Sequence, residues 1–247
     1  MKRYDPQPEI EIAARIGFLS KSIWLEYFAS GSVAWKNRKW ADLVNRGHFE
    51  KHWSQYAKDI IVPVAKDRLV RLYSGDAVSA PPRLSVIDHD EIVLRSFLNI
   101  QHAGVLKVGK FESELKMEDS RLKQRISRDD SQKFPDLFVK LAGPNETQGI
   151  GIEIEISRKE PKRYRQIMMA YMCTRPVDTI IYVTNLQTVK NAVAAAIRET
   201  YFPTWEKPVG FVALSDWQKD PLSAKIDFGE YTSSLEQLRT EVKKSAA

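Results

Sequence analysis

Apolar residues recur at helical spacing through the first quarter of the chain, where they predict three short helices over residues 9–16, 19–29 and 33–45. Ser20 is a suitable N-cap for the second helix, and Gly47 follows the third. Two extended segments, residues 49–53 and 60–64, come next. A short helix over residues 66–73 completes this part of the chain.

Three small helices followed by a hairpin predict a winged helix-turn-helix, in which the third helix enters the DNA major groove. The polar face of that helix carries Lys36, Asn37, Arg38 and Lys39. These side chains would meet phosphates or base edges. The alternative is a solvated polar face on a surface helix. The order of the helices, the turn at Gly47 and a local excess of positive charge favour DNA binding.

The rest of the chain alternates between helical and strand patterns. Residues 1–76 form the predicted first domain, residues 77–84 a linker rich in proline and serine, and residues 85–247 the second domain. Helices are predicted over residues 86–100, 161–172, 186–201 and 234–244, strands over 105–108, 111–115, 134–139, 151–159, 179–184 and 209–214, and a solvated loop or short helix over 118–132. This alternation predicts a two-domain α+β protein whose second domain is an α/β/α sandwich with a mixed sheet.

The two strands at the middle of the second domain carry its acidic residues. A turn at residues 142–146 separates the strands, so they are expected to form a hairpin. Side chains alternate along a strand, so Glu153, Glu155 and Lys159 share one face, with the two carboxylates about 6–7 Å apart. Asp136 stands near the start of the neighbouring strand. Such acids repel one another unless a cation offsets them, and Mg²⁺ or Mn²⁺ is the expected partner of carboxylate oxygens.

The alternative for this acidic stretch is an ordinary exposed strand face, on which Arg158 and Lys159 balance the acids.

Charge is unevenly distributed along the chain. The formal net charge of the 247 residues is +6. Residues 1–75 contain 13 Lys and Arg against 8 Asp and Glu, which places most of the excess in the predicted first domain. This distribution indicates a polyanionic partner for that domain.

Other sequence features bear on the expected cellular location of the protein. Cys173 is the only cysteine, which excludes an internal disulfide and a cysteine-rich zinc module. No run of about 18 apolar residues is present, and the first residues lead into no apolar signal core. We therefore expect a cytoplasmic protein that does not insert into a membrane.

The order of elements in the second domain resembles the restriction-endonuclease-like fold of the PD-(D/E)xK superfamily. Pro135-Asp136 would be its PD motif and Glu153 its second acid. Glu155 stands where the usual lysine would be. The lysine must then come from elsewhere, and Lys159 has the right strand parity.

The whole chain, from about residue 8 to 215, resembles the replication-relaxation family and most of all the MobC-type (MOBC class) relaxases of mobilisable plasmids. The resemblance is carried, in order, by residues 46–50, His89-Asp90, Pro135-Asp136, Glu153, Glu155, Lys159 and Arg163-Tyr164. It implies a nickase that cuts one strand of double-stranded plasmid DNA at an origin of transfer. An accessory relaxosome protein and a coupling protein would be its partners.

The same resemblance implies roles for single residues. Asp136, Glu153 and Glu155 would hold one or two divalent metals, which activate a nucleophile and offset charge on the phosphate. Lys159 would orient the nucleophile or stabilise developing charge. Arg163 could pair with a phosphate. Tyr164 could attack covalently, as in other relaxase classes, but core packing is the favoured interpretation for this tyrosine.

Two other functions are compatible with the sequence. The first is a non-catalytic plasmid replication initiator or DNA-binding regulator with a degenerate nuclease domain, which Glu155 at the lysine position supports. The second is an endonuclease that cuts both strands.

Overall fold

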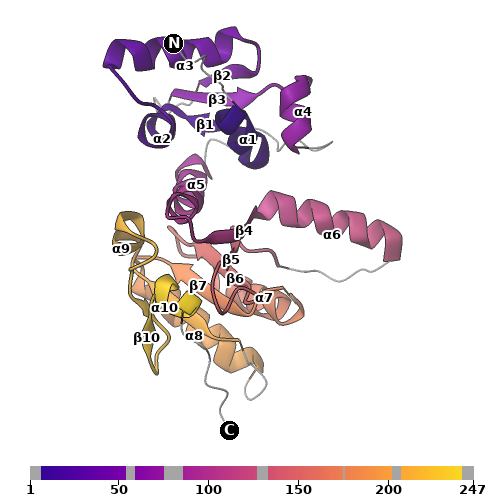
Figure 1. Ribbon diagram of the computed structural model, residues 1–247. Coiled ribbons are helices and arrows are strands. Elements are labelled where there is room, and N and C mark those ends of the chain that lie inside the picture. The colour runs from indigo at the N-terminus through magenta and orange to yellow at the C-terminus, as the bar shows by residue number, and fades with distance from the viewer. Residues whose placement is uncertain are drawn as a thin grey trace. The chain divides into compact units, whose positions relative to one another are not determined.

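The computed structural model describes residues 7–53, 59–74, 86–126, 133–174, 176–201 and 207–240. The described residues form ten helices and two sheets (Figure 1). The chain divides into two compact units, Met1–Leu94 and Arg95–Ala247. The division falls within α5 (Ile87–His102), and the predicted linker over residues 77–84 lies outside the described residues.

The N-terminal unit consists of helices and a small three-stranded sheet. Its elements before α5 are α1 (Gln7–Ile16), β1 (Leu19–Ser20), α2 (Lys21–Tyr27), α3 (Val33–Asn45), β2 (Phe49–Trp53), β3 (Asp59–Pro63) and α4 (Arg68–Ser74). The strands are antiparallel in the order β1-β3-β2, so that β3 is the central strand. The predicted three helices, hairpin and fourth helix are all present, and β1 is an addition that the sequence pattern did not predict.

Local sequence explains where the helices of this unit begin and end. The Ser20 hydroxyl accepts a hydrogen bond from the backbone N–H of Ile23, as expected of an N-cap. Ser32 caps α3 in the same way through Trp35, at 3.3 Å. Gly47 follows α3 with a φ of 79°, a left-handed conformation that glycine adopts without steric cost. These signals explain why α3 has the predicted bounds.

The start of α5 belongs to the N-terminal unit through its contacts. Ile87 is buried in an apolar cluster with Phe18, Ile60 and Val62. Sequence analysis assigned the whole helix to the second domain, because it follows the proline- and serine-rich linker predicted over residues 77–84.

The C-terminal unit is built on a seven-stranded mixed sheet. Its remaining elements are β4 (Leu106–Phe111), α6 (Glu112–Ile126), β5 (Leu137–Leu141), β6 (Ile150–Ile154), α7 (Pro161–Cys173), β7 (Thr179–Val183), α8 (Gln187–Tyr201), β8 (Val209–Val212), α9 (Leu214–Lys219), β9 (Ile226–Asp227), β10 (Thr232–Ser233) and α10 (Leu235–Thr240). The strand order is β10-β9-β8-β7-β6-β5-β4. The three strands β6, β7 and β8 are parallel, and the other pairings are antiparallel.

Helices cover both faces of this sheet (Figure 1). On one face, α7 and α8 pack over a cluster that includes Phe138 and Tyr182. On the other face, the ring of Phe97 in α5 lies 5.0 Å from that of Phe111 in β4. Because both faces are covered, every residue of β6 and β7 is buried, as is usual for parallel strands.

Two strand predictions in this unit were wrong. Residues 111–115 were predicted as a strand, but the chain turns into α6 at Glu112. The carboxylate of Glu114 accepts a hydrogen bond from the backbone N–H of Phe111 at 2.8 Å, which caps the helix start in the manner of a capping box. The strand predicted to continue to Lys159 ends at Ile154.

Among the described residues, no helix is both long and apolar enough to cross a membrane.

Candidate functional site

The hairpin of β5 and β6 brings Asp136 and Glu153 together. Leu137 pairs with Ile152 in the antiparallel register, so Asp136 and Glu153 lie next to each other on the face that α7 and α8 cover. One carboxylate oxygen of Asp136 accepts a hydrogen bond from the backbone N–H of Ile154 at 2.8 Å. This contact holds Asp136 beside the end of β6. The predicted pair of acids is therefore adjacent in space.

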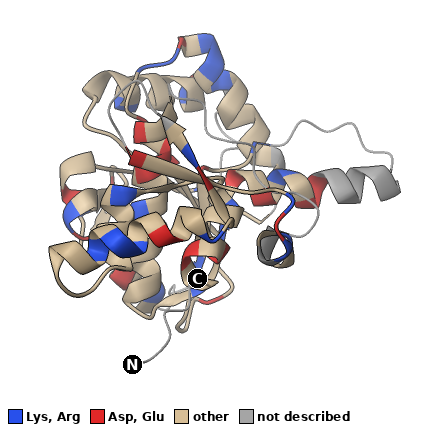
Figure 2. Cartoon of the chain, turned by 90° about the horizontal axis from the view of Figure 1, so that it is seen from above, with Lys and Arg blue, Asp and Glu red and all other residues tan. Residues whose placement is uncertain are grey.

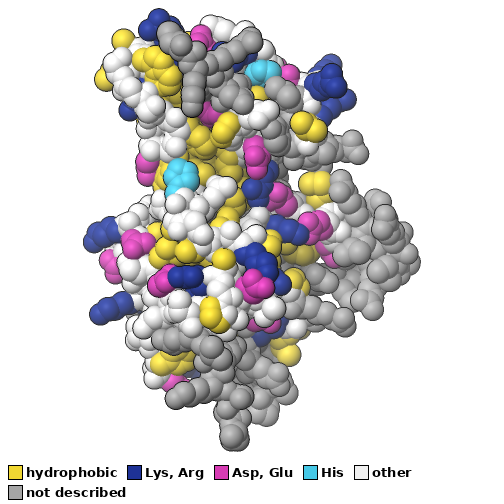
Figure 3. Space-filling view, viewed as in Figure 1, with side chains coloured by type: hydrophobic (Ala, Val, Ile, Leu, Met, Phe, Trp, Pro, Cys, Tyr) yellow, Lys and Arg dark blue, Asp and Glu magenta, His cyan; other side chains and the backbone are white. Residues whose placement is uncertain are grey.

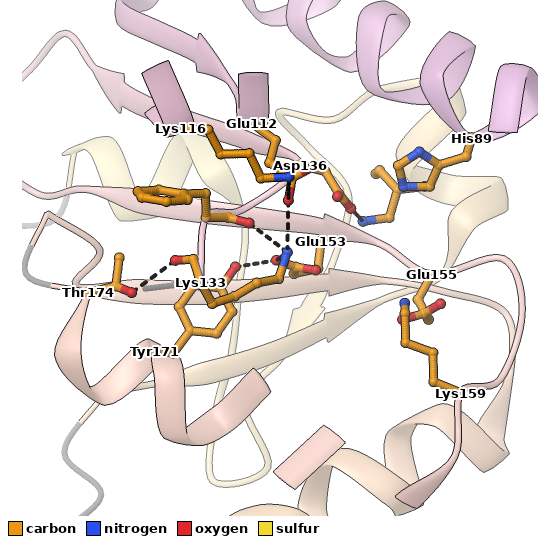
Figure 4. A network of polar contacts seen from close by, with 12 residues as sticks. His89, Glu112, Lys116, Lys133, Asp136, Glu153, Glu155, Lys159, Tyr171 and Thr174 are labelled. Carbon is orange, nitrogen blue, oxygen red and sulfur yellow. Dashed lines mark hydrogen bonds and ion pairs between the residues drawn. The ribbon is translucent and has the colours of Figure 1, made fainter. Parts of the chain in front are cut away.

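Glu153 is the most enclosed carboxylate of this site. Its residue is 3% exposed, the Tyr171 hydroxyl donates a hydrogen bond to it, and the Lys133 ammonium lies 3.0 Å from the same oxygen (Figure 4). Burial raises the pKa of Glu153 to about 7, and the neighbouring charge of Asp136 acts in the same direction. Glu153 can therefore exchange a proton near neutral pH.

Lys133 supplies the cation at this position. Its ammonium also donates to the backbone carbonyl of Phe134 and lies 3.8 Å from the carboxylate of Glu112. Burial alone would lower the pKa of Lys133, but the charges of Glu153, Asp136 and Glu112 outweigh it and raise the pKa well above its usual value. Lys133 consequently remains charged beside Glu153.

The C-terminal end of α7 fixes the positions of Lys133 and Tyr171. The Thr174 hydroxyl donates to the backbone carbonyls of Lys133 and Ala170, each at 2.9 Å. The Lys207 ammonium donates to the backbone carbonyls of Tyr171 and Thr174, each at 2.7 Å. Carbonyls at a helix C-terminus otherwise have no intrahelical partner, so these bonds stabilise the last turn of α7.

Tyr182 adds a buried hydroxyl to the same face. It is the register partner of Glu153 in the parallel pairing of β6 and β7, and its side chain is fully buried. Within the described part of the chain, its hydroxyl has no hydrogen-bond partner. A buried hydroxyl that lacks a partner is costly, and a bound water or ligand is one way to satisfy it.

Glu155 and Lys159 form a second, separate pair just beyond β6 (Figure 4). Glu155 is buried, and its backbone N–H donates to the carbonyl of Val183 at 3.0 Å. Because β6 ends at Ile154, Lys159 reaches Glu155 by a turn of the chain and not along a strand face. The exposed strand face that was the alternative for this stretch is not what forms, since Glu153 and Glu155 are both buried.

Tyr164 and Arg163 stand in different surroundings at the start of α7. Tyr164 is fully buried in the apolar cluster, and its hydroxyl accepts a hydrogen bond from the backbone N–H of Lys159 at 3.1 Å. Burial raises the pKa of Tyr164. This environment favours the packing role for Tyr164. Arg163 is exposed.

A cavity of about 400 Å³ opens between α7 and α8. Its rim includes Arg158, Arg165 and Glu199, and its floor is formed by alanines of α8. Arg165 and Glu199 face each other across it at 2.8 Å.

The DNA-binding residues predicted from the sequence lie on α3 of the N-terminal unit. Asn37 and Arg38 are exposed, whereas Lys36 and Lys39 are partly buried. Lys39 lies 3.6 Å from Asp42 and 5.8 Å from the centre of the Trp35 ring. Trp40 and Leu43 are buried, and they lie one helical turn after Lys36 and Lys39, which explains why these two lysines are partly buried. Of the four predicted residues, Arg38 lies on the side of α3 opposite the buried pair and Asn37 lies at its flank, so the structure does not place all four on one solvent-facing surface.

A second group of cations in this unit was not predicted. Lys66, Arg68 and Arg71 are exposed on α4 and the turn before it, and Lys and Arg side chains gather over α4 in Figure 3. Elsewhere in the chain, acidic and basic residues are interspersed along the helices (Figure 2).

Asp136 and Glu153 fit a divalent cation by their chemistry. Mg²⁺ sites at phosphate substrates commonly use one or two carboxylates, completed by waters and phosphate oxygens. Within the described ranges, no group of three or more His, Cys, Asp or Glu is arranged to hold a metal ion. The third ligand expected from the sequence, Glu155, pairs with Lys159.

Sequence analysis missed Lys133 and Glu112. Lys133 precedes β5 in a segment without regular secondary structure, so no periodic pattern assigns it to a face. Its position three residues before Asp136 was the only sequence signal that Lys133 belongs to the site. Glu112 was missed because its segment was predicted to be a strand.

Comparison of the chain with protein-family models, with curated proteins and with solved structures finds no match.

The raised pKa of Glu153 predicts that stability falls as pH rises. The folded-state pKa of about 7 exceeds the ordinary value of 4.5, so between these values the folded protein binds more protons than the unfolded chain. The free energy of unfolding should therefore decrease from pH 4.5 to 7, by roughly 3 kcal/mol at most. Urea denaturation across this range measures the decrease. Glu153→Gln should flatten the curve, and an unchanged slope in that variant would contradict the assignment to Glu153.

Proposed function

We propose that this protein is a relaxase-type DNA nickase that uses a divalent metal, Mg²⁺ or Mn²⁺, to cut one strand. The observation that carries this proposal is the placement of Asp136 beside Glu153 on a buried hairpin. The Lys133 ammonium lies between the carboxylates of Glu153 and Glu112. Adjacent carboxylates and a fixed cation are the groups that phosphodiester cleavage requires.

The order of elements supports the same proposal. The fold implied by the resemblance requires a helix, strands, an acidic hairpin, then helix, strand, helix and strand. The C-terminal unit has α5, β4, the β5–β6 hairpin, α7, β7, α8 and β8 in that order, with α6 inserted between β4 and the hairpin where a second strand was expected. The N-terminal unit has three helices followed by the β2–β3 hairpin, an order compatible with a winged helix. In the proposal, α3 is its recognition helix.

Each residue of the site has a proposed role. Asp136 and Glu153 would hold the metal, which would supply an activated water and offset charge on the scissile phosphate. Glu155 would be a third ligand only if its ion pair with Lys159 opened, and Lys159 would stabilise developing negative charge. Arg163 lies exposed on α7, where it can reach a phosphate.

The DNA contacts proposed for the N-terminal unit are made by Lys36, Asn37, Arg38 and Lys39 on α3. The substrate proposed from the resemblance is double-stranded plasmid DNA at an origin of transfer. An accessory relaxosome protein and a coupling protein are its proposed partners.

A second function is favoured by one specific observation. Both buried glutamates are already paired with lysines of the same chain, Glu153 with Lys133 and Glu155 with Lys159. A site whose acids are neutralised internally can be stable without metal. This arrangement fits a DNA-binding initiator or regulator that does not cut.

The experiment that tests the proposal uses supercoiled plasmid that carries the cognate origin. With Mg²⁺ or Mn²⁺, the full chain should convert it to open circles, and chelation of the metal should stop the conversion. Linear DNA would instead show a double-strand endonuclease. A gel shift with the plasmid left supercoiled would support the non-cutting regulator.

A further inference from the structure

We infer that the Lys133 ammonium occupies the cation position of the Asp136–Glu153 pair, and that a divalent metal binds there only by displacing it. This inference rests on the proposed metal site, which it deepens. Lys133 is thereby a positioning residue that holds the glutamate in place before the metal arrives.

The surroundings of the ammonium are those of a bound cation. Its nitrogen lies 3.0 Å from Glu153 and 3.8 Å from Glu112, and it donates to the carbonyl of Phe134. All three neighbours present oxygen, the ligand that Mg²⁺ and Mn²⁺ prefer. The side chain of Lys133 is only 16% exposed, so the ammonium is held inside the site and not at its edge.

The buried Tyr182 hydroxyl is an independent sign of a ligand at this position. It projects from the strand beside Glu153, and within the described residues it has no hydrogen-bond partner. A lysine ammonium offers only three donors, whereas a hydrated metal ion brings waters that can bond to a hydroxyl. The waters of a hydrated ion that enters the site would therefore offer the Tyr182 hydroxyl a hydrogen-bond partner, which Lys133 does not.

The backbone of Lys133 is anchored while its side chain can move. The Thr174 hydroxyl holds the Lys133 carbonyl at 2.9 Å, and Thr174 is itself fully buried. A lysine side chain has four rotatable bonds beyond this anchor, so the ammonium can leave Glu153 while the backbone of Lys133 stays in place. The displaced ammonium then remains near the site, where it can meet a phosphate.

Competition between the two cations has a direct consequence for metal affinity. Removal of the lysine charge takes away the cation that competes with the metal for Glu153, so affinity should rise. Lys133→Gln keeps a hydrogen-bond donor for Glu153 but carries no charge. We expect this variant to bind Mn²⁺ about tenfold more tightly than the wild type. In the wild type, only the fraction of molecules in which Lys133 has left the site can bind the metal, and the apparent affinity is reduced by that fraction.

The test is calorimetric titration of Mn²⁺ into the full-length protein without DNA at pH 8, together with melting curves. The metal-free melting temperature of Lys133→Gln should fall, and the rise on addition of Mn²⁺ should exceed that of the wild type. Lys133→Arg should bind Mn²⁺ as weakly as the wild type, since it retains the charge.

Lys116→Gln is the matched control for general electrostatics. It removes the same charge from a lysine that bonds the same Glu112 at 2.9 Å, but its side chain is 58% exposed. Its Mn²⁺ affinity should stay within about twofold of the wild type.

The outcomes separate the two proposals. If the wild type binds Mn²⁺ and Lys133→Gln binds it no more tightly, the displacement inference is overturned and the metal site stands. If neither protein binds Mn²⁺ and neither cuts DNA, the proposed metal-dependent function fails and the inference fails with it.

Discussion

Asp136→Asn is expected to reduce nicking by about a thousandfold or more and to leave DNA binding unchanged. Loss of one carboxylate from a two-carboxylate site removes half of the charge that holds the metal in place. Without that ion, neither the attacking water nor the scissile phosphate is stabilised, which accounts for an effect of this size.

The fold should tolerate this change. The carbonyl of an asparagine at this position can still accept the hydrogen bond from the backbone N–H of Ile154, which Asp136 accepts at 2.8 Å. The change also removes a charge that raises the pKa of Glu153. We therefore expect the metal-free melting temperature to be equal to or above that of the wild type. A purely structural role for Asp136 would instead lower it.

The measurement pairs a nicking assay on supercoiled plasmid with melting curves, with and without Mn²⁺, on the same samples. Asp178→Asn is the matched control, because Asp178 also accepts a hydrogen bond from a backbone N–H, that of Gly149 at 2.7 Å. This control should nick normally. Persistent nicking by Asp136→Asn, or an unchanged response of its melting temperature to Mn²⁺, would contradict the metal site.

Elements with caps and strong periodicity were predictable from the sequence. The prediction for α3 has the observed bounds, because Ser32 caps its start and Gly47 follows its end. The acidic hairpin was also predicted, since its apolar strands flank an obvious turn. Adjacency of Asp136 and Glu153 followed from the hairpin alone.

Features that depend on tertiary contacts were not predictable. The alternating pattern continues beyond Ile154, but β6 ends there because its paired residues on β7 end at Val183. Alternation at residues 111–115 is typical of a strand, yet α6 begins here, and its start is capped by the hydrogen bond that the backbone N–H of Phe111 donates to the Glu114 carboxylate. The backbone of Lys133 is held by a hydrogen bond from Thr174, which caps α7 about 40 residues later in the chain, and no local sequence pattern predicts this contact.

The second large effect is expected from α3. Lys36→Ala/Arg38→Ala should weaken binding to duplex DNA about 50-fold at 0.1 M salt. Each phosphate contact contributes about 0.9 to the slope of log affinity against log salt, so loss of two contacts should make the slope shallower by about 1.8. Alanine is the strongest helix former, so α3 itself should persist.

This double variant separates a DNA-reading helix from an ordinary solvated face. Lys190→Ala/Arg198→Ala on α8 lowers the net charge by the same amount and serves as the control, with a slope close to the wild-type value. Fluorescence anisotropy with labelled duplex DNA, over a range of salt concentrations, measures both slopes. Equal slopes in the two double variants would assign the salt dependence to overall charge and would contradict a recognition role for α3. A shallower slope in the α3 variant alone would place about two phosphate contacts on Lys36 and Arg38.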